Sequence, residues 1–165
     1  MKSMQEFSFE SEPFLSPCAF TGHRFLGKDF SKQKLKKEIE RVLSMGVTDF
    51  YNGMAMGFDL LAAEIVLSLK KKYPQIRLIC CVPFYGQEKY YSDEDKKRYV
   101  TVLKKADISL QLSDQYTKDC MHKRNRYMAD RADILIAYCN KPTGGTAYTV
   151  EYFHSVHPEG EIVFI

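Results

Sequence analysis

The sequence contains no tryptophan, and no apolar run in it approaches the roughly 18 residues that a membrane-spanning helix needs. Its five cysteines include no Cys-x-x-Cys pair and no Cys/His spacing of the kind that holds zinc. The net charge is only +3, whereas a dedicated nucleic-acid-binding domain carries a larger, clustered excess. These absences argue against a membrane anchor, a metal site and a nucleic-acid partner.

What is present has the composition of a globular protein. Hydrophobic residues make up 45% and charged residues 27% of 165 residues, enough for one domain with a substantial core. Residues 1–14 are polar and acidic and lack the apolar centre of a signal peptide, so we expect a mobile leader before a single domain over residues 15–165. Unpaired thiols are typical of a reducing compartment, which predicts a cytoplasmic protein. Cys120 falls in a polar helix, which leaves an exposed thiol as an alternative to a buried one.

Strand-like and helix-like segments alternate along the chain. Short apolar runs indicate strands at Cys18–Thr21, Val47–Asn52, Ile76–Val82, Asp107–Leu112, Asp133–Cys139 and Glu161–Ile165. The intervening segments carry helical spacing or capping residues and predict helices at Ser31–Met45, Asp59–Lys72, Ser92–Lys105, Thr117–Arg131 and Thr146–His157. The alternation predicts an α/β fold, namely a Rossmann-like three-layer sandwich with a mostly parallel sheet of about six strands.

In open α/β sheets ligands bind beyond the carboxyl ends of the strands, so the loops that follow strands are the informative ones. The first is Thr21-Gly22-His23-Arg24. Its glycine allows a close backbone approach, Thr21 and His23 offer polar groups, and Arg24 suits a phosphate. A plain turn with an exposed arginine explains the same residues.

The second loop runs from Asn52 to Asp59 and joins a strand to an apolar helix, with two glycines four residues apart. Backbone amides at the start of a helix bind anions, and we therefore expect ligand contacts from Asn52, Gly53, Met54 and Gly57. Asp59 fits an N-cap position, with a contact to ribose hydroxyls as the alternative. The spacing matches neither a Walker A loop nor Gly-x-Gly-x-x-Gly.

The third loop again joins a strand to a helix and ends in Gly144-Gly145-Thr146, which predicts a second phosphate cradle. Asn125 lies in a methionine stripe of its helix and needs a hydrogen-bond partner, either a ligand or nearby backbone. Glu64 is the only charge in an apolar helical stretch, and Glu151 stands three residues before His154. Each glutamate is either a surface residue or a candidate catalytic acid or base.

Together these motifs resemble a known family. Thr21-Gly22-His23-Arg24, the loop Gly53–Asp59, Asn125-Arg126 and Gly144-Gly145-Thr146 occur in the order found in YpsA-like proteins of the SLOG superfamily. The resemblance extends from Cys18 to the end of the chain. It implies a Rossmann-like sheet and a pocket for nucleotides or nucleotide-derived molecules that is lined by the three glycine loops, with Arg126 added to the ligand-binding residues.

The superfamily includes the Rossmann-like domain of DNA-processing protein A and the Lonely-guy phosphoribohydrolases. Lonely-guy enzymes carry a catalytic glutamate three residues after the threonine of their glycine signature, whereas Glu151 follows Thr146 by five. We therefore expect a sensor or regulatory module that binds an ADP-ribose-, NAD- or nucleoside phosphate-like molecule and requires no cofactor. Its resemblance to YpsA links it to bacterial cell division or stress.

Two other functions remain open, as does homo-oligomer formation. One is a hydrolase that cleaves an N-glycosidic or phosphate bond of a nucleotide, and the other is a single-stranded DNA-binding protein like DNA-processing protein A.

Overall fold

The computed structural model describes residues 16–165, so the predicted mobile leader lies outside the described residues. Six strands are present: β1 (Cys18–Gly22), β2 (Asp49–Asn52), β3 (Arg77–Val82), β4 (Ile108–Gln111), β5 (Ile134–Tyr138) and β6 (Glu161–Phe164). They alternate with five α-helices: α1 (Lys32–Ser44), α2 (Phe58–Lys70), α3 (Asp93–Lys105), α4 (Cys120–Arg131) and α5 (Gly145–Val156). A short 3-10 helix, Gln87–Tyr90, precedes α3.

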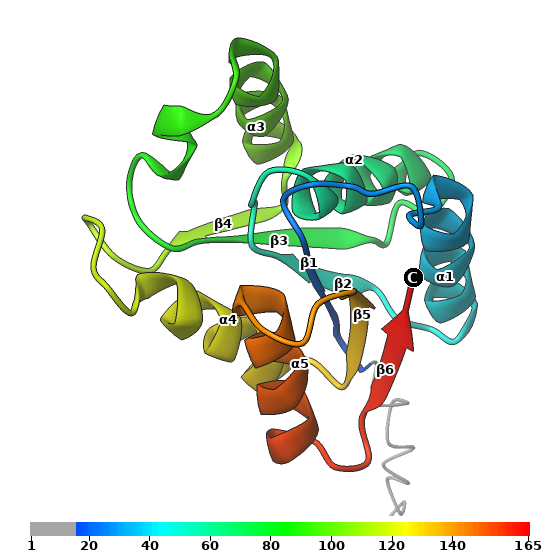
Figure 1. Cartoon of the computed structure of the whole chain (residues 1–165). Helices are drawn as coiled ribbons and strands as arrows, with labels where there is room; N and C mark the ends of the chain where they lie inside the picture. Colours follow the sequence, from blue (N-terminus) through cyan, green and yellow to red (C-terminus); the bar gives the residue numbers. More distant parts are fainter. Residues whose placement is uncertain (1–15) are drawn as a thin grey trace, which may run out of the picture.

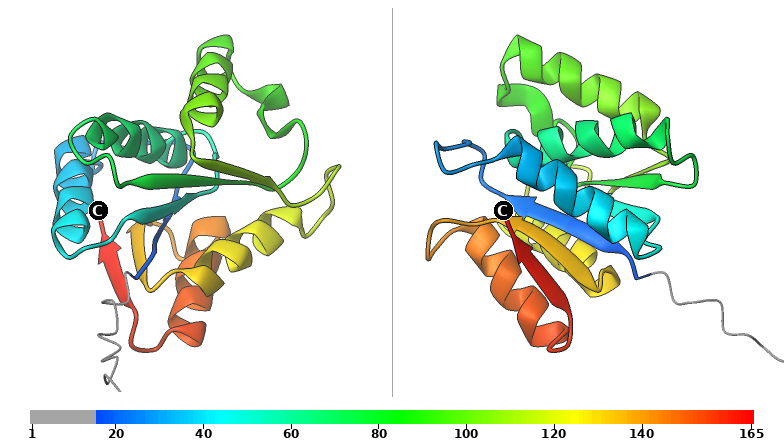
Figure 2. Two further views of the ribbon diagram at one scale, coloured as in Figure 1. Left: turned by 180° about the vertical axis from the view of Figure 1, so that it is seen from behind. Right: turned by 90° about the vertical axis from the view of Figure 1, so that its right-hand side faces the viewer.

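The strands form one parallel sheet in the order β4-β3-β2-β1-β5-β6. Helices α1, α2 and α3 cover one face, and α4 and α5 cover the other, as Figures 1 and 2 show. The predicted Rossmann-like three-layer sandwich with a six-stranded, mostly parallel sheet is therefore confirmed. Strands β2, β3 and β4 are added on one side of β1, and β5 and β6 then follow on its other side. The junction between β1 and β5 is therefore the topological switch point.

Alternate residues of each central strand enter two different cores. Phe20 of β1 packs with Phe50 and Phe58 on the α1–α2 face, where the Phe20 and Phe50 ring centroids lie 5.9 Å apart. Its neighbour Ala19 enters the opposite core, against Phe153 of α5. Large side chains on one face and smaller ones on the other let α4 and α5 pack close to the strands.

Local capping explains where two of the helices begin. The Ser31 hydroxyl accepts a hydrogen bond from the Lys34 amide (3.1 Å) at the start of α1. Ser92 does the same for the Asp95 amide (3.1 Å) at the start of α3. The N-cap of α2 is Gly57, however, so the prediction that Asp59 occupies this position is wrong. Asp59 lies in the first helical turn, where the helix dipole still favours a carboxylate.

The cysteines are unpaired, and all but one are buried. Cys18, Cys80 and Cys81 lie in the cores, and Cys120 is also buried despite its polar helix. Cys139, one residue beyond β5, is half-buried because the strand ends before it. Over residues 16–165, no helix has both the length and the apolar character needed to cross a bilayer.

Candidate functional site

A cavity of about 280 Å³ opens at the carboxyl ends of β1 and β5, at the topological switch point. We call it the inner cleft. Its walls come from β1 and the loop after it, the start of α2, one face of α4 and the start of α5. The lining residues are Phe20, Thr21, Gly22, His23, Arg24, Ala55, Asp59, Met121, Arg124, Asn125, Gly145 and Thr146.

The three predicted loops meet around this cleft, and His23 joins them. Its carbonyl oxygen accepts a hydrogen bond from the Phe58 amide (3.2 Å) at the start of α2. Its ring Nε2 accepts another from the Asn140 amide (3.0 Å) in the loop after β5. Burial, and secondarily the charge of Lys141, lower the pKa of His23. The imidazole is therefore neutral at pH 7, and its remaining proton is on Nδ1.

Gly57 allows the first two loops to touch. Its φ is +77°, a left-handed conformation that residues with a side chain rarely adopt. A Cβ atom here would lie 2.1 Å from the carbonyl oxygen of Arg24. Gly57 therefore positions the cleft rather than lining it.

The second loop uses its own amides, contrary to the predicted anion site there. The Met54 amide donates to Oδ1 of Asn52 (2.8 Å), and the Ala55 amide donates to Oδ2 of Asp59 (3.3 Å). The Asn52 side chain in turn donates to the backbone oxygen of Asp59 (2.8 Å). Asn52, Gly53 and Met54 are buried and absent from the lining. These residues shape the loop, and the Met54 and Ala55 amides already have acceptors within it.

Asp59 is the acidic residue of the inner cleft. The residue is 4% exposed, and its Oδ1 is a buried oxygen with no hydrogen-bond partner among residues 16–165. Burial raises the pKa of its carboxyl to about 6, while the charge of Arg124 and the Ala55 amide act in the opposite direction. Buried polar atoms in proteins are nearly always paired, so the unpaired Oδ1 of Asp59 is an exception among the described residues.

Arg124 is the principal residue that sequence reasoning missed. It is 5% exposed, and it donates to the Gly53 carbonyl and to Oδ1 of Asn125 (Nε to Oδ1, 2.8 Å). Burial lowers its pKa, but a guanidinium remains cationic at neutral pH. The sequence signal that could have identified Arg124 is its position three residues after Met121 and four before Met128. These positions lie on the helix face that Asn125 also occupies. Arg124 thus supplies the partner that Asn125 was predicted to need.

The third loop presents free backbone donors. Gly145 and Thr146 begin α5 and line the inner cleft, whereas Gly144 precedes the helix and lies outside the lining. The first amides of a helix have no partner within it, and its dipole favours an anion. The cleft therefore combines helix amides and Arg24 with the hydrogen-bond acceptor of Asp59.

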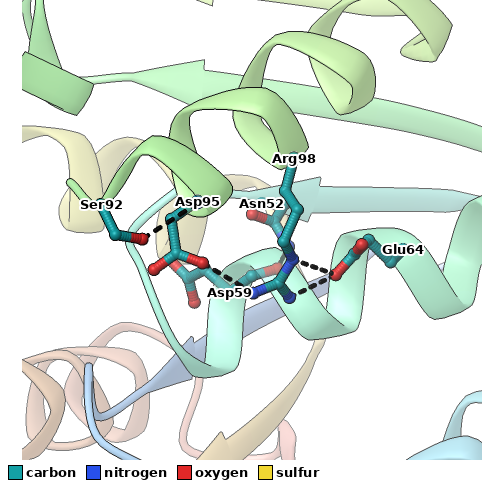
Figure 3. Close-up of polar contacts among 6 residues, drawn as sticks. All are labelled: Asn52, Asp59, Glu64, Ser92, Asp95 and Arg98. Carbon is teal, nitrogen blue, oxygen red and sulfur yellow. Dashed lines mark hydrogen bonds and ion pairs between the residues drawn. The ribbon is translucent and has the colours of Figure 1, made fainter.

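The structure does not bring the remaining candidates to the inner cleft. Glu64 points from α2 toward Arg98 of α3 and accepts a hydrogen bond from its Nε at 3.0 Å, as Figure 3 shows. Glu151 and His154 are exposed on α5. Arg126 donates to Oδ2 of Asp119 (2.7 Å) and to the Tyr148 hydroxyl (3.0 Å). Within residues 16–165, no group of three histidine, cysteine or acidic residues could hold a metal ion.

Comparison with known proteins identifies the family of the chain. A sequence profile named YpsA, described as the YspA SLOG family, matches residues 27–161. An uncharacterised SPbeta prophage-derived protein of Bacillus subtilis, YoqJ, is 32% identical over 136 residues, or 72% of this chain and 80% of that one. A UPF0398 protein of Halalkalibacterium halodurans is 28% identical over 136 residues, or 78% of this chain and 70% of that one.

Two solved structures share the fold. DNA processing protein A from Streptococcus pneumoniae superposes with a TM-score of 0.67 at 19% identity, over 91% of this chain and 50% of that one. DNA processing protein A from Helicobacter pylori, described for its single-stranded DNA binding mode, gives 0.65 at 17% identity, over 91% of this chain and 65% of that one. The chain thus spans half to two thirds of these longer proteins, and at this identity the likeness concerns the fold.

Proposed function

Because the chain belongs to the YpsA family of SLOG proteins, we propose that it binds a nucleotide or nucleotide-derived small molecule in the inner cleft and acts as a sensor or regulatory module. The observation that carries this proposal is the unpartnered Oδ1 of buried Asp59, beside the free amides at the start of α5. A ligand with both hydroxyl groups and a phosphate satisfies both features.

The two ends of such a ligand have separate recognition groups. A ribose hydroxyl donates to Oδ1 of Asp59, and hydrogen bonds to a charged group contribute about 1.5–3 kcal/mol. The phosphate accepts from the Gly145 and Thr146 amides, and Arg24 at the rim adds a charge-assisted contact. Arg124, which the protein already holds in place, balances the charge of Asp59 without moving.

A thermal-shift assay with AMP, ADP-ribose and NAD tests this proposal. Ligand at 100 times its dissociation constant stabilises a protein by about 2.7 kcal/mol, so the melting temperature should rise measurably. Asp59→Asn should weaken binding roughly tenfold because the acceptor loses its charge. Glu64→Gln is the matched control, since it makes the same change on the same helix outside the cleft. Unchanged melting with all three compounds would argue against the proposal.

A regulatory role is favoured over catalysis because neither glutamate candidate reaches the inner cleft. One observation nevertheless favours nucleotide hydrolysis as a second candidate: the pKa of Asp59, about 6, suits a general acid or base. Incubation of the protein with the same compounds, followed by chromatography, separates the two roles. Turnover that disappears in Asp59→Asn would favour hydrolysis, and intact compounds would favour sensing.

Single-stranded DNA binding is the candidate suggested by the Helicobacter pylori protein. The supporting feature is a groove of about 730 Å³ between α2 and α3, with Lys71, Lys97 and Lys105 in its lining. Contacts with phosphates would make the affinity for an oligonucleotide fall steeply with salt concentration. The absence of a nucleic-acid partner stays a prediction until this is measured, and so does homo-oligomer formation.

A further inference from the structure

A second cavity, of about 420 Å³, adjoins the inner cleft and shares His23 and Arg24 with it. We call it the outer cavity. It is lined by the loop after β1 and by the end of β5 with the residues that follow it. His23 and Arg24 thus line both cavities, and we call this pair the ridge between them.

The inner cleft is small, so the adjoining outer cavity matters for the binding of a larger ligand. Pockets that enclose whole small ligands have volumes of roughly 300–1,000 Å³, and 280 Å³ lies below that range. The inner cleft has room for a phosphate and a sugar. A ligand larger than this extends beyond the cleft, and the outer cavity adjoins it, since His23 and Arg24 line both.

The linings of the two cavities differ in chemistry. The inner cleft contains Asp59 and Arg124, both buried and charged. The outer cavity instead contains Phe25, which is 79% exposed, and Leu26, which is 39% exposed. An exposed phenylalanine beside a cavity offers a face on which a planar ring can stack.

The wall of the outer cavity is held rigidly. The Tyr138 hydroxyl donates to Oδ1 of Asp29 (2.6 Å) and accepts from the Gly27 amide (3.1 Å). The Asn140 side chain donates to Oδ2 of Asp29 (3.1 Å). This network fastens the loop after β1 to the loop after β5. Neither loop needs to move for a ligand to lie across the ridge, which lowers the entropic cost of binding.

From this juxtaposition we infer that the outer cavity is the subsite for the planar base of the ligand, with Phe25 as its stacking residue. The inference rests on the proposed function and deepens it, because it selects nucleotides over sugar phosphates. The phosphate and sugar occupy the inner cleft, and the base crosses the ridge beside His23.

Calorimetric titration with AMP and with ribose 5-phosphate tests the inference, because ribose 5-phosphate has a hydroxyl group where AMP has the base. Stacking of one base on an aromatic side chain is expected to make AMP bind roughly ten- to hundredfold more tightly to the wild type. Phe25→Ser should abolish most of this advantage and leave the affinity for ribose 5-phosphate unchanged. Phe25→Tyr should retain it, and Tyr90→Ser, which alters an aromatic residue that is 88% exposed outside both cavities, should have no effect.

The outcomes separate this inference from the proposed function. Equal affinities of the wild type for AMP and ribose 5-phosphate, or an AMP advantage that survives in Phe25→Ser, would overturn the base subsite alone. Binding of ADP-ribose without binding of either smaller compound would also overturn it and leave the proposed function standing. Failure of all three compounds to bind would overturn both.

Discussion

Among single residues, Asp59 contributes most to the inner cleft, and it does so at a cost in stability. Its carboxyl is buried, one of its oxygens has no partner, and burial is the main cause of its raised pKa. Groups that are strained or poorly solvated in the free protein are common at binding sites. The unpaired oxygen is therefore the feature by which this site can be recognised.

The raised pKa of Asp59 predicts how stability depends on pH. Between its ordinary value of 3.8 and about 6, the folded protein keeps a proton that the unfolded chain has released. The stability that this carboxyl contributes is therefore fully present below about pH 4. It is lost as the pH rises through 6, which lowers the free energy of unfolding by about 3 kcal/mol. The Asp59→Asn variant should lack this pH-dependent part of the free energy of unfolding. Urea unfolding of both proteins across this range measures it, and parallel curves would contradict the assigned pKa.

A substitution at Gly57 tests the contact between the first two loops. Gly57→Ala places a methyl group against the Arg24 carbonyl in a left-handed backbone, and we expect it to lower the free energy of unfolding by more than about 1 kcal/mol. Gly145→Ala is the control, because a Cβ there meets nothing within 4 Å and its φ is not positive. Equal stabilities of the two variants in denaturant titrations would show that the contact is unimportant.

At this scale the sequence predicts which loops matter but not which atoms are free. Glycine spacing singles out the second loop as an anion site, yet the Met54, Ala55 and Phe58 amides donate to Asn52, Asp59 and His23. Which donors remain depends on what a distant loop places against them, and local sequence does not contain that information. Arg124 was overlooked for a related reason, since its burial becomes visible only once α4 is packed.

Among the elements, boundaries follow closely from local chemistry. Ser31 and Ser92 indicate the starts of their helices in the sequence. All six strands begin and end within two residues of the predicted bounds. The sequence does not determine which side of an apolar helix its neighbour covers. Glu64 therefore had two interpretations until α3 placed Arg98 beside it.

The connection between the loops after β1 and β5 yields a prediction at the scale of elements. Tyr138→Phe removes the hydroxyl that links Gly27, Asp29 and Asn140, and we expect a loss of about 1 kcal/mol of stability. Exchange of the Gly27 amide with solvent should also become faster. Tyr152→Phe serves as the control, because its hydroxyl reaches the exposed Asp130. Unchanged exchange at Gly27 would show that the two loops are held by other contacts.

For the whole molecule, the parallel order of the strands determines where ligands can bind. The β1–β5 junction brings together loops that are more than a hundred residues apart in sequence, as the contact between His23 and Asn140 shows. The strand–helix alternation was sufficient to predict the sheet and the edge at which the three loops meet. The identity of the ligand depends on the shapes of two cavities, which no pattern of residues specifies.

The most direct test is a nuclear magnetic resonance titration of the backbone amides with ADP-ribose. We expect saturable shifts at Thr21–Phe25 and at Gly145–Thr146, and none at Lys71 or Lys105. Shifts confined to the α2–α3 groove, or a spectrum unchanged at millimolar ADP-ribose, would contradict binding at the junction of β1 and β5.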